Sequence, residues 1–107
     1  MSTWGTLDAE FHFGVPRDIA YAIEGVPTGS ETGPNIGVLD DGARTWVEGR
    51  LRDVDDIQSP IVLGWFAKVC IMTHPARATL LWEIDRGPRY RYEWDGHQII
   101  KLRGVLD

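Results

Sequence analysis

The sequence predicts an α+β domain in which one antiparallel sheet carries two helices on one of its faces. Two observations predict this class. Several short segments alternate apolar and polar residues with a period of two, which is typical of strands that bury one face. One longer segment, Ser59 to His74, is apolar in nearly every direction and carries a single charge, Lys68. It exceeds the length of an ordinary strand, so it indicates a helix.

The first half of the chain predicts a strand, a helix and a hairpin. Leu7, Ala9 and Phe11 alternate with polar residues in the first strand. The Val15-Pro16 step opens a helix, because proline is tolerated in a first turn. Asp41-Gly42 is a strong hairpin signal. The predicted elements are a strand over 4–13, a helix over 16–25, a loop over 26–34, and strands over 35–40 and 43–54.

The second half predicts the long helix and a three-stranded meander. Asp53, Asp55 and Asp56 precede the helix, where carboxylates complement its N-terminal dipole. The His74-Pro75 step ends it, since a residue before proline avoids the helical conformation. Asp95-Gly96 marks the last turn. The predicted elements are a helix over 57–73 and strands over 78–84, 89–94 and 97–103.

The resulting order is β-α-β-β-α-β-β-β. Its first six elements resemble the ferredoxin-like split βαβ arrangement, with a hairpin added at the C-terminal end. No repeat, low-complexity tract or linker divides the chain, so we expect one domain over residues 1–107. Element order alone does not determine the order of the strands in the sheet.

Composition predicts a cytoplasmic protein that binds neither nucleic acid nor membrane. The net charge is −5, which argues against binding a phosphate backbone. The single cysteine, Cys70, fits a reducing compartment, and the N-terminal residues do not resemble an export signal. The apolar segment over 60–72 is too short to span a bilayer.

The sheet face opposite the predicted helices carries aromatic and charged residues. Asp8 and Glu10 are expected to lie across from Arg50 and Arg52, as cross-strand pairs of opposite charge. The simpler interpretation is a solvated face. The alternative is a ligand-binding face, because large rings on a surface are typical of recognition. Its residues would be Trp4, His12, Trp46 and Arg50.

No catalytic, metal or cofactor site is predicted. Asp8, Glu10 and His12 project from one strand face, as metal ligands can, but neighbouring arginines would repel a cation. Cys70 and His74 are one helical turn apart, yet a cysteine in so apolar a segment behaves as a small hydrophobic residue. The glycine-containing loop over 29–33 lacks the lysine of a phosphate-binding loop.

The final meander has an aromatic stripe and an arginine stripe. Tyr90, Tyr92 and Trp94 alternate with Arg89 and Arg91. We expect the aromatic stripe to be core; the opposite orientation would expose Tyr90 and Tyr92 as a recognition patch.

The leading functional hypothesis is a small non-catalytic protein that binds a protein partner, itself included as a homodimer, in the manner of an inhibitor, antagonist or adaptor. The surplus apolar surface of the long helix favours it. Trp65 is the expected anchor, since tryptophan is enriched among residues that dominate interface energies. A small-ligand or nucleotide-binding module, using the open sheet face or the 26–34 loop, is the alternative, and an enzyme is third. The predicted partner-binding residues are Trp65, Ile61, Lys68 and Met72.

Overall fold

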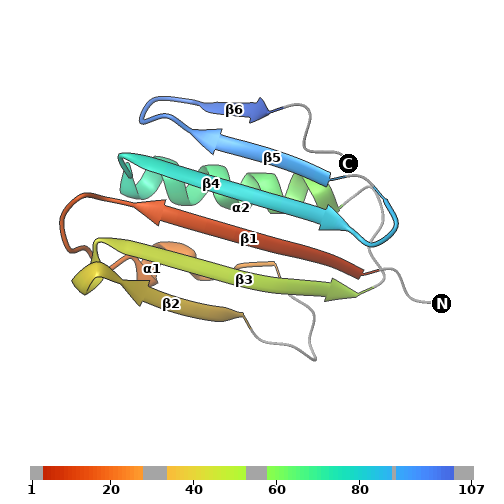
Figure 1. Ribbon diagram of the computed structural model, residues 1–107, viewed down its shortest axis with the longest axis horizontal. Helices are drawn as coiled ribbons and strands as arrows, with labels where there is room; N and C mark the ends of the chain where they lie inside the picture. The colour runs from red at the N-terminus through yellow and green to blue at the C-terminus, as the bar shows by residue number, and fades with distance from the viewer. Residues whose placement is uncertain (1–3, 28–33, 53–57, 88, 103–107) are drawn as a thin grey trace.

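The computed structural model describes residues 4–27, 34–52, 58–87 and 89–102. It has a six-stranded antiparallel sheet and two helices, so the predicted α+β class is confirmed (Figure 1). The acidic residues Asp53, Asp55 and Asp56 and most of the predicted 26–34 loop lie outside the described residues. The elements are β1 (Trp4–His12), α1 (Ala20–Ile23), β2 (Asn35–Leu39), a 3-10 turn (Asp40–Gly42), β3 (Arg44–Arg52), α2 (Gln58–Thr73), β4 (Arg77–Ile84), β5 (Arg89–Trp94) and β6 (Ile99–Leu102).

The first helix is much shorter than the predicted 16–25 segment. The backbone N–H of Arg17 donates to the carbonyl of Gly42 at 3.0 Å, which ties this segment to the β2–β3 turn. The Asp18 carboxylate accepts the N–H of Ala20 at 3.0 Å, a local bond that competes with helix formation. Gly25 has a φ of 78°, a conformation that glycine adopts readily. Only one helical turn therefore forms.

The last strand begins two residues later than predicted. The Asp95 carboxylate accepts the backbone N–H groups of His97 and Gln98, both at 2.9 Å. These bonds keep both residues in the turn and leave Ile99 as the first strand residue.

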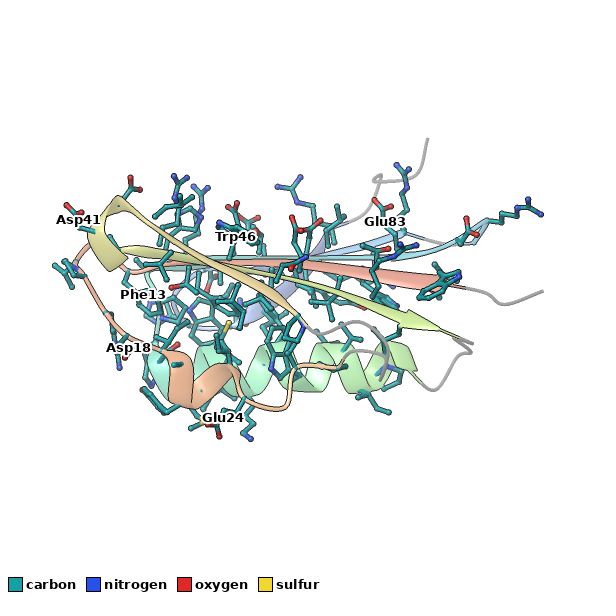
Figure 2. All side chains as sticks on the ribbon, turned by 90° about the horizontal axis from the view of Figure 1, so that it is seen from below. Phe13, Asp18, Glu24, Asp41, Trp46 and Glu83 are labelled. Carbon is teal, nitrogen blue, oxygen red and sulfur yellow. The ribbon has the colours of Figure 1, made fainter. Side chains whose placement is uncertain are left out.

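The strands lie in the order β2-β3-β1-β4-β5-β6, with every neighbouring pair antiparallel. The central strand β1 sets the register: its Ala9 lies opposite Val47 of β3 and Leu80 of β4. Directly opposed residues share a face, so these positions form one continuous apolar surface. Both helices lie on that side, while Trp46 and Glu83 project from the other (Figure 2).

The core fills the layer between sheet and helices. The Phe11 ring of β1 lies against Trp65 and Phe66 of α2, with ring centroids 6.2 and 5.6 Å apart. Trp82 of β4 is 1% exposed. Trp94 is also buried and donates its indole N–H to the carbonyl of Pro75 at 2.9 Å.

The helix side of the sheet also receives the aromatic stripe of β5. Tyr92 lies opposite Leu80, and Tyr90 opposite Trp82, which belong to the buried side of β4. Both tyrosines are half-buried and pack against the core. The predicted orientation of this stripe is confirmed, and the arginines of β5 project from the open face.

Candidate functional site

The long helix α2 is apolar on the side that faces away from the sheet as well as on the side that faces it. Ile61, Ile71 and Met72 are 52%, 62% and 43% exposed. Gly64 and Lys68 lie exposed between them. We call these five residues the outer face of α2. Neither described helix is both long and apolar enough to cross a membrane.

Trp65 does not belong to this outer face, which corrects the expectation that its ring is exposed there as the anchor for a partner. Its side chain is 7% exposed and meets Phe11 edge to face. Trp65 stands at the border between the two sides of the helix, and its large ring is directed inward, where it removes more apolar area from water. Ile71, which was not among the predicted partner-binding residues, contributes more exposed apolar surface to the outer face than Trp65 does. It lies three residues after Lys68, and this helical spacing could have placed it on the same face.

The Cys70 and His74 pair does not form a nucleophilic site. Cys70 is fully buried, and this burial raises the pKa of its thiol to about 12. The thiol is therefore protonated at neutral pH, whereas the nucleophile of a catalytic cysteine is the thiolate. His74 lies after the helix, and its ring is 6.4 Å from that of Trp94.

The open sheet face differs from its predicted pairing. Asp8 lies opposite Glu48, and Glu10 opposite Trp46, so neither acid has an arginine directly across from it in β3. The expectation of Asp8 and Glu10 paired with Arg50 and Arg52 is wrong, because it needed a different β1–β3 register. Within the described ranges, no cluster of three or more His, Cys, Asp or Glu side chains is arranged to hold a metal ion.

The Asp8 carboxyl lies in an acidic part of the open sheet face. Partial desolvation raises its pKa, and the negative charges of Glu48, Glu83 and Glu10 add to the effect. A carboxyl whose pKa is higher in the folded state binds protons more tightly there than in the unfolded chain. The contribution of Asp8 to stability is therefore most favourable below the ordinary pKa of aspartate and is lost as pH rises through the raised pKa.

We accordingly expect Asp8→Asn to increase the melting temperature at pH 7, because it removes a charge from an acidic neighbourhood. The advantage over wild type should shrink as pH is lowered below the ordinary pKa of aspartate, where Asp8 is protonated in both states. Melting curves at a series of pH values measure this difference.

Asp95→Ala is the matched control, because the pKa of Asp95 is lowered, chiefly by the backbone N–H groups of Gln98 and His97. This variant should be less stable than wild type at pH 7. A lower melting temperature for Asp8→Asn at neutral pH would contradict the assignment.

Of the four predicted ligand-face residues, Trp4 and Arg50 lie in contact at one end of β1, while Trp46 and His12 lie towards its other end. The Arg50 guanidinium lies 4.7 Å from the centroid of the Trp4 ring. Trp46 lies far from Trp4 along the sheet. Trp4 lies opposite Arg52 of β3, and Arg52 is six residues from Trp46 in the same strand, a distance of roughly 20 Å. His12 lies opposite Arg44, near the other end of β1, and its ring nitrogen is 3.2 Å from the Glu10 carboxylate.

Trp4 and Arg50 border a polar hollow of about 460 Å³. Glu83 and Arg89 on its wall form an ion pair at 3.6 Å. The hollow combines a ring with both signs of charge, so a small ligand bound here would be recognised through polar contacts. Ligand binding on this face stays a prediction.

A second apolar surface, which the sequence analysis missed, lies where α1 meets the edge strand β2. Ile36 and Val38 of β2 are 48% and 61% exposed on the helix side. Ile19 and Ile23 border the same hollow, whose volume is about 400 Å³. An adjoining hollow of about 360 Å³ shares Ile23 and Ile36 with it. We call this surface the β2–α1 groove. The feature of the sequence that could have indicated this groove is the absence of any charged residue in β2.

Comparison with known proteins does not assign this chain to a family. No family model matches it, and neither a curated protein nor a solved structure matches it.

Proposed function

We propose that this protein is a non-catalytic association domain that binds a protein partner through the outer face of α2. The observation that supports the proposal is the exposure of Ile61, Ile71 and Met72 on a helix whose opposite side already fills the core. A helix that covers a sheet needs only one apolar side for folding. Large apolar side chains on the second side are typical of interaction surfaces.

The partner segment best suited to this face is an amphipathic helix. A Cβ atom built on Gly64 would meet no heavy atom within 4 Å beyond its own stretch of helix, so a partner backbone can approach α2 closely at this point. Ridges of apolar side chains on either side would then pack into its grooves, as helix pairs do. Lys68 is the only charge on the face, and it favours an acidic residue at the matching partner position.

The fold is compatible with such a role without requiring it. We interpret the β2-β3-β1-β4 part of the sheet, with α1 and α2, as the ferredoxin-like split βαβ arrangement extended by β5 and β6. This architecture serves many functions, so the proposal depends on the helix surface and not on the fold.

The proposal is tested by placing the photoreactive residue benzoylphenylalanine at position 68 and irradiating cells that express the variant. We expect a covalent adduct with one protein species, because Lys68 is exposed at the centre of the face. The same residue at position 91, exposed on the open side of β5, is the control.

Adding Ile71→Lys to the position-68 probe should abolish the adduct, since it places a charge in the apolar contact. Ile71 is 62% exposed, so the fold should persist, as circular dichroism would verify. Adducts of equal yield at positions 68 and 91, or an adduct unaffected by Ile71→Lys, would contradict the proposal.

A further inference from the structure

The edge strand β2 lacks the features that normally prevent edge strands from pairing with other chains. Asn35–Leu39 contains no charged residue and no proline, and in the described part of the chain no strand lies beyond it. Ile36, Val38 and Leu39 are 48%, 61% and 40% exposed. Natural proteins usually protect such an edge with lysine, proline or a bulge. The opposite edge, β6, carries Lys101, whose ammonium lies 4.9 Å from the centroid of the Tyr90 ring.

The residues of β2 are self-complementary about Gly37. In an antiparallel two-fold pairing centred there, Ile36 lies opposite Val38 of the second copy. Both side chains project on the helix side, next to the β2–α1 groove that Ile19 and Ile23 border. Each copy therefore offers two apolar side chains and a hollow beside them, which is what an isologous interface requires.

The opposite side of the same edge is covered by an aromatic ring. Trp46 of β3 pairs with Gly37. A Cβ atom built on Gly37 would lie 2.2 Å from a carbon of the indole ring, so the ring extends over this glycine. Aromatic side chains covering a cross-strand glycine are a known means of stabilising sheets. Two copies would place two Trp46 rings beside the two-fold axis.

The charges next to β2 favour a second copy in this antiparallel orientation. The carboxylates of Asp40 and Asp41 follow Leu39 directly. Asp40 forms an ion pair with Arg44 of its own copy at 3.3 Å. In the antiparallel pairing this end of β2 approaches Pro34 and Asn35 of the second copy, which carry no charge and so do not repel Asp40. A neutral edge also suits self-association of a chain whose net charge is −5 better than a charged edge would.

We propose that two copies of this chain pair through β2, with Gly37 opposite Gly37, so that their sheets join into one. The occupant of the β2–α1 groove is then the Ile36 and Val38 pair of the second copy. This interface is separate from the outer face of α2, so its failure would leave the partner-binding proposal unaffected.

Sedimentation velocity of the purified full chain tests the pairing. We expect wild type to sediment as a dimer and Val38→Lys as a monomer with an unchanged circular dichroism spectrum, because the substituted side chain is exposed in one copy but buried between two. Ile100→Lys is the control: Ile100 is 41% exposed on the other edge, and this variant should stay dimeric. A monomeric wild type, or a dimeric Val38→Lys, would overturn the proposal.

A disulfide test then fixes the register. Asn35 lies opposite Leu39 of the second copy in the proposed pairing, while within one copy they are about 13 Å apart, too far for a disulfide. Oxidation of the double variant Asn35→Cys, Leu39→Cys should give a covalent dimer, and neither single variant should. Native Cys70 is buried and can remain. Equal crosslinking of the single and double variants, or none in the double variant, would contradict this register.

Discussion

Truncating Trp65 to alanine is expected to destabilise the fold by about 3–5 kcal/mol, the usual cost of removing a large buried aromatic side chain. Trp65 is 7% exposed and meets the Phe11 ring of β1 edge to face. The substitution would leave a cavity between α2 and the sheet and remove one partner of an aromatic pair. Urea unfolding followed by circular dichroism measures the change in the free energy of unfolding.

Two further variants make this expectation specific. Ile71→Ala, on the same helix but 62% exposed, should change stability by no more than about 0.5 kcal/mol. Trp65→Phe should cost less than Trp65→Ala, because it keeps a ring and removes an indole N–H that is buried without a hydrogen-bond acceptor among the described residues. Equal losses for Trp65→Ala and Ile71→Ala would show that Trp65 is not part of the core.

Adding a single methyl group at Gly5 is expected to destabilise the fold by about 1–3 kcal/mol, the typical cost of overpacking a close-packed site. A Cβ atom there would lie 2.2 Å from a carbon of the Trp82 ring. Trp82 is 1% exposed and surrounded by core side chains, so its ring has little room to move. The urea midpoint of Gly5→Ala should fall accordingly.

Gly64→Ala is the matched control, because it makes the same chemical change in open space. A Cβ on Gly64 would meet no heavy atom within 4 Å beyond its own stretch of helix. Alanine should therefore stabilise α2 by about 1 kcal/mol through its higher helix propensity. The two substitutions are expected to have opposite signs; a loss of stability at both positions would contradict the distinction between a glycine required for packing and one that is not.

Local patterns in the sequence determined which segments form strands and which face of each strand is buried. The alternation of Leu7, Ala9 and Phe11 predicted the buried face of β1, and each of these side chains is at most 2% exposed. Tyr90, Tyr92 and Trp94 likewise face the helix side. This information is local, because side chains in a strand alternate with a fixed period of two. The helix α2 was also predicted from local information, because its apolar segment is longer than an ordinary strand.

Features that depend on how elements meet were decided only by the tertiary structure. The β1–β3 register places Asp8 opposite Glu48, which no single-strand pattern contains. Trp65 is at the border of the two sides of α2, and the position of Phe11 beneath the helix decided that it is core. The exposure of β2 follows from its place at the sheet edge. In each case the feature depends on a contact between residues far apart in the chain. A local pattern can predict a strand or a helix, but it does not contain the element that packs against it.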